Sequence, residues 1–269
     1  MHDEGPLARS RKRRQGTELL CEAVFRPLAH LVVLALLPLR AAPPLVVVAG
    51  AATGVSAAVE IARGDLLIAA LLLQLKTVLD NADGQLARLS GRVTAFGRYL
   101  DSECDFLVNA TLFAALGPTL GWLQALAGFL VLTFVLGVNF NADRLYRQSR
   151  GADSIAMPEA MGAAAFLARV YAIVYAPQDM LAERFAAWRI RKLGADASVY
   201  HDAATVGILA NFGLSTQLAA FGACLAFDRP DVYIWLLAGC LVVAIAVVVR
   251  RDLRARKAVR IHSRVEELV

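Results

Sequence analysis

Charged residues are scarce in this sequence for its length. Asp, Glu, Lys and Arg make up 19% of its 269 residues, whereas hydrophobic residues make up 58%. Soluble globular domains usually carry about one charged residue in four. The composition therefore excludes an ordinary soluble domain and predicts an all-α integral membrane protein.

Cysteine is also rare, and its positions exclude some kinds of site. The four cysteines have no metal-ligand spacing, and three of them lie in or beside apolar segments. We therefore expect them to be reduced and structural. The cysteines are Cys21, Cys104, Cys224 and Cys240.

The first apolar run lacks a small-residue cleavage site after it, so no cleaved signal peptide is predicted.

No nucleic-acid-binding motif accompanies the basic excess of the chain, whose formal net charge is +5. We attribute this charge to cytoplasmic loops and contacts with lipid head groups, and expect membrane lipids rather than nucleic acid as partners. The basic residues Arg9 to Arg14 place the N-terminus in the cytoplasm. With alternating spans, both termini and the polar stretch after residue 79 then face the cytoplasm of a multi-pass protein in the inner or plasma membrane.

Six apolar segments predict six transmembrane helices preceded by an N-terminal interfacial helix. The run Leu28–Leu39 is too short to span a bilayer and is interrupted by Pro38, so we place it at the interface. We divide the chain into a basic tail and interfacial helix (1–43), a six-span catalytic membrane domain (44–250) and a charged cytoplasmic tail (251–269). The expected spans are 44–62, 66–79, 97–116, 122–141, 201–227 and 232–249, with a break after the third at Gly117–Pro118.

One apolar segment is expected not to span. Pro158–Pro177 contains Arg169 and has basic residues on both flanks, so a single crossing would leave one basic flank outside. We predict a re-entrant or interfacial helix there. Glu183–Lys192 is expected to form an amphipathic surface helix.

The polar stretch from Asp80 to Asp105 interrupts this apolar pattern. Asp80 and Asp83 are three residues apart and share a face of a helix. Gly84, Ala87 and Arg88 continue that face, and Gly97, Asp101 and Asp105 follow at four-residue intervals. Two helices meeting near Ser90–Arg92 would point four carboxylates at one another, those of Asp80, Asp83, Asp101 and Asp105.

Clustered carboxylates near hydrocarbon are costly unless a cation lies between them. Oxygen ligands suit Mg²⁺ or Mn²⁺, and two bridged ions stabilise both oxygens of a phosphoryl displacement. The alternative is that these are helix-end carboxylates paired with nearby arginines. Lys76, one turn before Asp80, either pairs with Asp80 or extends to the membrane surface.

The stretch reads D-x2-D-G-x2-A-R-x8-G-x3-D-x3-D. It resembles the signature of the CDP-alcohol phosphatidyltransferase family at every fixed position. The resemblance implies a phospholipid-synthesising enzyme that transfers a phosphatidyl group from a CDP-alcohol, such as CDP-diacylglycerol, to an alcohol acceptor and releases CMP. It also implies a homodimer.

The resemblance assigns roles to individual residues. The aspartates Asp80, Asp83, Asp101 and Asp105 would bind two Mg²⁺ or Mn²⁺ ions, and Asp105 would be the general base. The CDP pocket would contain Asp83, Gly84, Ala87, Arg88 and Gly97.

The start of the first span departs from the family pattern. Members often have Pro-Asn there and a Thr three residues after the Asn, whereas this chain has Pro44, Leu45 and Val48. Both polar groups are missing, which removes nucleotide contacts from this end of the pocket. Thr53 is the nearest substitute.

The acceptor is less well defined by the sequence. Arg144, Arg147 and Arg150 end the fourth span, where they either bind an acceptor phosphate, as in inositol phosphate, or are ordinary positive-inside residues. His201 and Asp202 either face the cavity or are solvated. Alternatives are the same enzyme class with glycerol phosphate, serine or another alcohol, a divalent-cation transporter, or a catalytically silent scaffold.

Overall fold

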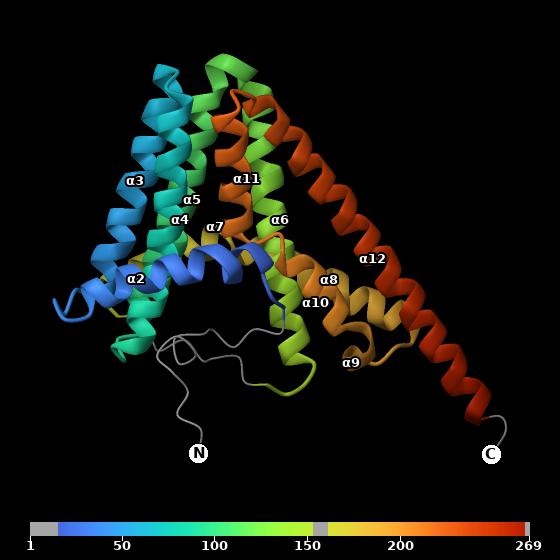
Figure 1. The fold of residues 1–269 in the computed structure, drawn as a ribbon. Coiled ribbons are helices and arrows are strands. Elements are labelled where there is room, and N and C mark those ends of the chain that lie inside the picture. Colours follow the sequence, from blue (N-terminus) through green and yellow to red (C-terminus); the bar gives the residue numbers. More distant parts are fainter. Residues whose placement is uncertain (1–15, 153–160, 267–269) are drawn as a thin grey trace.

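The computed structural model describes residues 16–152 and 161–266, which form helices and connecting turns without a strand. The predicted basic tail at residues 9–14 lies outside this part. The helices α3, α4, α5, α6 and α11 stand side by side, α12 slants away from them, and α2 crosses their lower ends (Figure 1). The all-α prediction is confirmed. In chain order the helices are η1 (Cys21–Phe25), α2 (Arg26–Leu36), α3 (Pro43–Arg63), α4 (Leu66–Leu89), α5 (Ala95–Leu120), α6 (Trp122–Gln148), α7 (Ala163–Val174), α8 (Ala176–Leu193), α9 (Ala197–Tyr200), α10 (Ala203–Ala210), α11 (Leu214–Ala226) and α12 (Pro230–Glu266).

Four helical segments within the described residues are long and apolar enough to cross a membrane. By length and composition these identify an integral membrane protein. Helices α4 and α5 have 24 and 26 residues, but each carries half of the charged stretch. The four segments are Pro43–Arg63, Trp122–Gln148, Ala203–Ala226 and Pro230–Ile261.

The segment predicted as one span over 201–227 is divided in two. Helix α10 ends at Ala210 and α11 begins at Leu214. The Glu18 carboxylate accepts hydrogen bonds from the backbone N–H and the hydroxyl of Thr216, both at 2.8 Å. The first N–H groups of a helix have no partners within it, so this side chain from the N-terminal segment stabilises the new helix start.

The predicted break at Gly117–Pro118 is wrong by one turn. Helix α5 continues through Pro118 to Leu120, and the chain turns at Gly121, where φ is +92°. A proline in the last turn removes only one backbone hydrogen bond, and glycine tolerates the positive φ. At the other end of the chain, α12 continues beyond Val249 to Glu266, so the predicted boundary at residue 250 lies within one helix.

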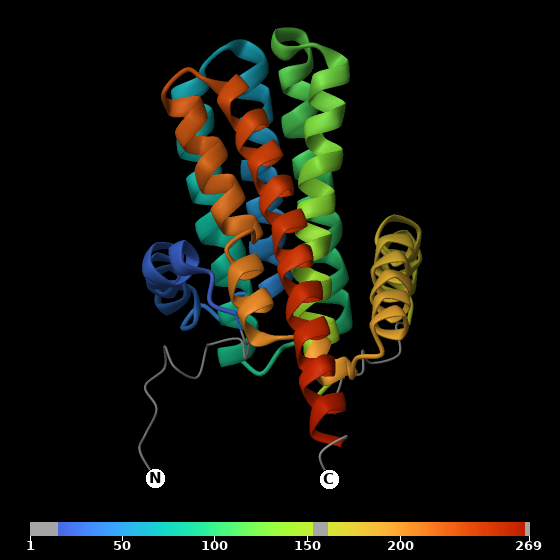
Figure 2. The same cartoon turned by 90° about the vertical axis from the view of Figure 1, so that its right-hand side faces the viewer.

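The helix α7 has 12 residues, a length of about 18 Å at 1.5 Å per residue. The hydrocarbon core is about 30 Å thick, so α7 alone is too short to span it, as expected for the segment Pro158–Pro177, whose first three residues lie outside the described part. The helix α8 exposes most of its residues and buries only Ala186 among them, as expected of a surface helix. In Figure 2 the pair stands to one side of the bundle.

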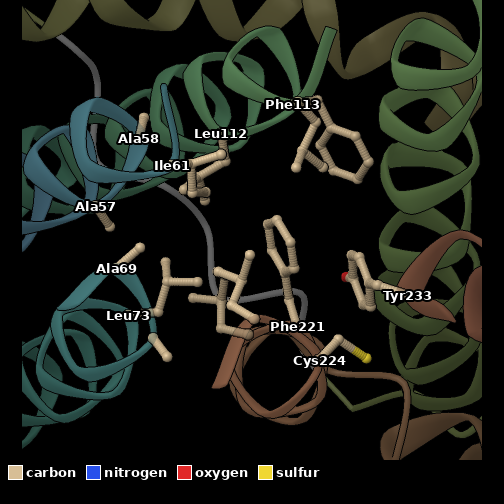
Figure 3. Close-up of a cluster of buried hydrophobic side chains, with 14 of the residues drawn as sticks. Ala57, Ala58, Ile61, Ala69, Leu73, Leu112, Phe113, Phe221, Cys224 and Tyr233 are labelled. Atoms are coloured by element: carbon tan, nitrogen blue, oxygen red, sulfur yellow. The ribbon is translucent and has the colours of Figure 1, made fainter. Parts of the chain in front are cut away.

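The apolar core joins α3, α4, α5, α6, α11 and α12 (Figure 3). Phe221 and Tyr233 stack with ring centroids 4.5 Å apart, and Phe113 lies 6.0 Å from Phe221. The core residues of α3 and α4, such as Ile61 and Leu73, lie toward the end of the bundle opposite the aspartates. At the aspartate end, a smaller apolar cluster that includes Val46, Ala82 and Leu86 packs α2, α3 and α4 beside the polar side chains.

Candidate active site

The aspartate stretch forms the end of α4, a short turn and the start of α5. Ser90 caps α4, and Gly91 turns the chain with φ +66°. The Thr94 side chain accepts a hydrogen bond of 3.1 Å from the backbone N–H of Gly97, which fixes the start of α5. The predicted meeting of two helices near Ser90–Arg92 is confirmed.

A cavity of about 470 Å³ lies between these helix ends. It brings together most of the residues that the motif singled out, whereas Ala87 and Gly97 do not line it. The Arg88 guanidinium lies against Gly84, where an added Cβ would be 3.2 Å from its Nη1. The predicted residues in the lining are Asp80, Asp83, Gly84, Arg88, Asp101 and Asp105.

The rest of the lining comes from two regions that sequence reasoning missed, the N-terminal segment and the start of α11. Cys21 Sγ donates to Asn81 Oδ1 at 3.0 Å, and Asn81 Nδ2 donates to Ser215 Oγ at 3.1 Å. One signal was available, because Glu18, Glu22 and Arg26 recur every fourth residue and so share a helix face. The additional lining residues are Gly16, Thr17, Glu18, Cys21, Glu22, Arg26, Asn81, Leu214 and Ser215.

Lys76 forms ion pairs with both Asp80 on its own helix and Asp105 on α5. Its side chain is 1% exposed, so it pairs with Asp80 and does not extend to the membrane surface. Helix α3 lies close to the Asp80 carboxylate. An added Cβ at Gly50 would lie only 2.9 Å from Asp80 Oδ1. The four carboxylates are thus not equivalent.

Asp83 has the opposite surroundings. It is 7% exposed, and its Oδ2 has no hydrogen-bond partner among the described residues. The neighbouring charge that acts on it most strongly is the like charge of Asp101. A buried charged oxygen without a partner is costly, so this side of the cavity fits a cation. Within the described residues, however, no group of three or more His, Cys, Asp or Glu side chains is placed to hold a metal ion.

A second cavity of about 250 Å³ is also lined by Asp105. Its lining includes Arg147, which pairs with Asp143 at 3.0 Å, and Tyr171 and Tyr175 from the region of α7. Asp105 lines both cavities. Gly16 and Leu214 also line both cavities, so Asp105 is the ionisable side chain that two molecules bound in them would share.

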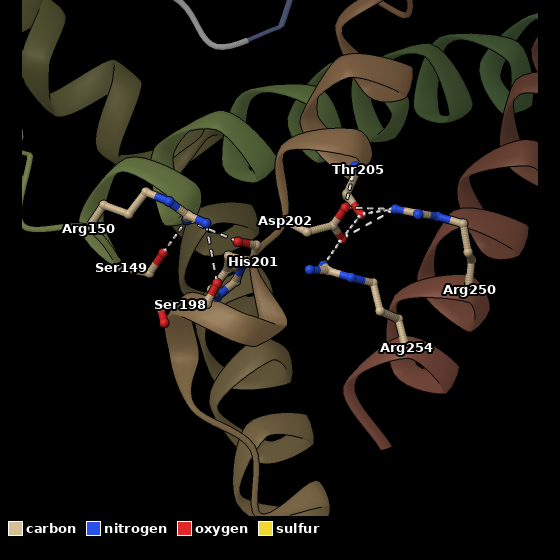
Figure 4. A network of polar contacts seen from close by, with 8 residues as sticks. All are labelled: Ser149, Arg150, Ser198, His201, Asp202, Thr205, Arg250 and Arg254. Atoms are coloured by element: carbon tan, nitrogen blue, oxygen red, sulfur yellow. Dashed lines mark hydrogen bonds and ion pairs between the residues drawn. The ribbon is translucent and has the colours of Figure 1, made fainter. Parts of the chain in front are cut away.

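The other two predicted arginines line neither cavity. Arg144 Nη1 contacts Glu183 at 2.6 Å, and its Nη2 donates to Asn141 Oδ1 at 2.8 Å. Arg150 donates to the backbone carbonyls of His201 and Ser198 at 3.0 and 3.3 Å (Figure 4). Both side chains thus hold α6 to the following segments.

His201 and Asp202 are not solvated, and they line neither of the two cavities described above. They are 6% and 5% exposed. Asp202 caps α10 through Thr205 and pairs with Arg250 and Arg254 of α12 (Figure 4). Burial and the guanidinium groups of Arg251 and Arg150 lower the pKa of His201 to about 4.

At the start of α3, the two residues that differ from the family pattern place no polar group toward the cavity. Leu45 and Val48 are 68% and 51% exposed. The hydroxyl of Thr53 donates to the carbonyl of Ala49 in its own helix at 2.8 Å. The described cysteines are all free, as expected.

Comparison with known proteins identifies relatives. The family model described as CDP-alcohol phosphatidyltransferase matches residues 39–190, more than half of the chain. A phosphatidylinositol phosphate synthase of Corynebacterium glutamicum is 41% identical over 68 residues, which are 25% of this chain and 31% of that protein. An archaetidylinositol phosphate synthase of Pyrococcus horikoshii is 40% identical over 58 residues, 21% of this chain and 31% of that protein. No solved structure matches the chain.

Proposed function

Because the chain belongs to the CDP-alcohol phosphatidyltransferase family, we propose that it transfers a phosphatidyl group from a CDP-alcohol to an alcohol acceptor. The donor is a CDP-lipid such as CDP-diacylglycerol, and the products are CMP and a phospholipid. The observation that carries this proposal is the position of Asp105 in the linings of both cavities. A base in that position reaches an acceptor in one cavity and a donor in the other.

The larger cavity is the donor site. Arg88 faces the diphosphate, since a planar guanidinium suits paired phosphate oxygens. Gly84 leaves room for that guanidinium. The unpartnered oxygen of Asp83 supports metal dependence, with Mg²⁺ or Mn²⁺ held among the motif aspartates. When bound, such a cation neutralises the diphosphate and the leaving CMP.

The reaction is one displacement at the β-phosphorus of the donor. Asp105 accepts the proton of the acceptor hydroxyl while that oxygen attacks the phosphorus. The bond between this phosphorus and the bridging oxygen breaks, and its electron pair leaves with CMP. The cavity walls hold both reactants in line, which removes much of the entropic cost of a bimolecular step.

The smaller cavity is the acceptor site, and we propose inositol phosphate as the acceptor. Two relatives are named for inositol phosphate lipids. An acceptor phosphate needs a cation, and Arg147 is the arginine of the predicted three that lines this cavity. We therefore narrow the acceptor-phosphate role from Arg144, Arg147 and Arg150 to Arg147.

We further propose six spans, formed by the four apolar segments together with α4 and α5. At 1.5 Å per residue, α4 and α5 are about 36 and 39 Å long, sufficient for a bilayer. The helix α2 lies at the interface, and its exposed Leu28, Leu31 and Leu34 contact lipid. The site and both termini face the cytoplasm, and the enzyme acts as a homodimer, as the family resemblance implies.

The test is release of CMP by the purified protein in liposomes. The assay contains CDP-diacylglycerol, Mg²⁺ or Mn²⁺, and in turn inositol phosphate, inositol, glycerol phosphate or serine. We expect CMP only with the correct acceptor, and loss of the signal with EDTA. Asp105→Asn should abolish turnover in a protein that still folds, since Asn cannot accept the proton.

The outcomes separate the parts of the proposal. CMP with glycerol phosphate or serine alone would replace the acceptor and keep the enzyme class. No CMP with any acceptor, from folded protein that binds CDP-diacylglycerol, would contradict the proposed reaction.

A further inference from the structure

The ammonium of Lys76 lies where the motif aspartates of α4 and α5 meet. It contacts Asp80 four residues later on α4 and Asp105 on α5. Lys76 lines neither cavity, so it approaches both carboxylates from the protein side, behind the cavity wall. The substrate side of these carboxylates faces the cavity.

Packing keeps this ammonium in place. The side chain is 1% exposed, and a buried ammonium is stable only with anionic partners. On α3, an added Cβ at Gly54 would lie 2.5 Å from Val108 Cγ1 and 3.3 Å from Lys76 Cγ. Glycine at this position therefore lets α3 pack closely against α5 and the lysine stem. The arrangement is a built part of the helix packing.

The other two motif aspartates face the same cavity without Lys76. More than nine-tenths of the Asp83 surface is buried, and its buried Oδ2 has no hydrogen-bond partner among the described residues. Its strongest electrostatic neighbour is Asp101 across the turn. A cation at Asp83 and Asp101 would supply the missing partner.

The surroundings of Asp80 and Asp105 thus differ from those of Asp83. Asp80 and Asp105 already share a positive charge, and a divalent ion bound to their same oxygens would be repelled by the ammonium. Asp83 has a buried oxygen without a hydrogen-bond partner, and Asp101 is the neighbouring carboxylate that acts on it most strongly.

We infer that Lys76 takes the place of one of the two divalent ions, so that this chain holds a single Mg²⁺ or Mn²⁺ ion, at Asp83 and Asp101. The inference rests on the proposed metal-dependent function. Lys76 is then a positioning residue that holds Asp105 between the two cavities by a permanent charge. Asp105 remains in position when the cation and the donor are absent.

The test counts bound Mn²⁺ in the full-length protein in detergent, by equilibrium dialysis and electron paramagnetic resonance, with CDP present. We expect one ion per chain, with the spectrum of isolated Mn²⁺. Asp83→Asn should weaken its binding at least 10-fold, whereas Asp80→Asn should change it less than 3-fold. Lys76→Met, similar in length but uncharged, should bind a second ion that couples magnetically to the first. Lys76→Arg keeps the charge and should bind one.

Two coupled Mn²⁺ ions in the wild-type protein would overturn this inference and leave the proposed reaction intact. One ion in folded Lys76→Met would also overturn it, because the lysine would then not be what excludes the second ion. If Lys76→Met does not fold, the wild-type count and the contrast between Asp83→Asn and Asp80→Asn decide the matter. No bound Mn²⁺ in folded wild-type protein would overturn both this inference and the proposed metal dependence.

Discussion

Asp83 and Asp202 are both buried aspartates near helix ends, with 7% and 5% of their surfaces exposed. Their surroundings differ in every other respect. The Asp202 carboxylate accepts from the backbone and hydroxyl of Thr205 and pairs with Arg250 and Arg254. Asp83 Oδ2 has no partner in the described part of the chain.

This difference separates a carboxylate that stabilises the fold from one that is available for binding. The hydrogen bonds and ion pairs of Asp202 are satisfied within the protein, which ties α10 to α12 (Figure 4). The unsatisfied oxygen of Asp83 costs stability, and binding a cation would recover that cost. Replacing Asp83 should therefore reduce turnover without reducing stability, whereas replacing Asp202 should reduce stability without reducing turnover.

The largest effect is expected from the matched substitutions Asp83→Asn and Asp202→Asn. Asp83→Asn should lower turnover roughly 10²–10³-fold, since a group that stabilises transition-state charge is lost, while the melting temperature stays unchanged or rises. Asp202→Asn should lower the free energy of unfolding by about 1 kcal/mol, because its arginine partners are partly exposed. Its turnover per folded molecule should be unchanged. CMP release and thermal unfolding in detergent measure both quantities, and equal loss of turnover in the two variants would contradict the distinction.

A smaller effect is expected from the arginines of the same two regions. Arg147→Ala should raise the KM for inositol phosphate about 10-fold or more, since a charge-assisted hydrogen bond contributes about 1.5–3 kcal/mol. The KM for the CDP-lipid should change little. Arg150→Ala is the matched control, because this side chain donates to backbone carbonyls instead. Steady-state kinetics with each substrate varied in turn measure the effect, and an unchanged acceptor KM in Arg147→Ala would reject its role.

The third effect concerns stability alone and is a pH dependence near Asp202. The folded protein lowers the pKa of His201 to about 4 through burial and the charges of Arg251 and Arg150, with Asp202 opposing. An unfolded histidine has a pKa of about 6.5, so the unfolded state binds more protons below that pH. This contribution to stability is present above pH 6.5 and is lost as the pH falls toward 4.

We therefore expect the melting temperature of the wild-type protein to fall between pH 7 and pH 4.5. The variant His201→Gln has no titrating group here and should lose less stability over the same range. The difference should be on the order of 1–3 kcal/mol at the lower pH. If the melting temperatures of the two proteins fall by the same amount over this range, His201 does not titrate as described.

Much of the candidate site followed from local sequence. The three- and four-residue spacing from Asp80 to Asp105 placed the aspartates on helix faces, and Gly91 lies in the predicted turn between those helices. Apolar runs located most of the helices. The break after Ala210 was not predicted, and Glu18, whose carboxylate stabilises the helix start after it, is nearly 200 residues away in the sequence.

The sequence by itself determined that this is a helical membrane protein with a motif of four aspartates, because both properties depend on composition and helical periodicity. Only the tertiary structure decided which aspartates are neutralised. Lys76 reaches Asp105 across 29 residues of sequence, and Arg250 reaches Asp202 across 48. Ion pairs of this kind depend on how separate helices pack, and the spacing of residues along one helix carries no information about that packing.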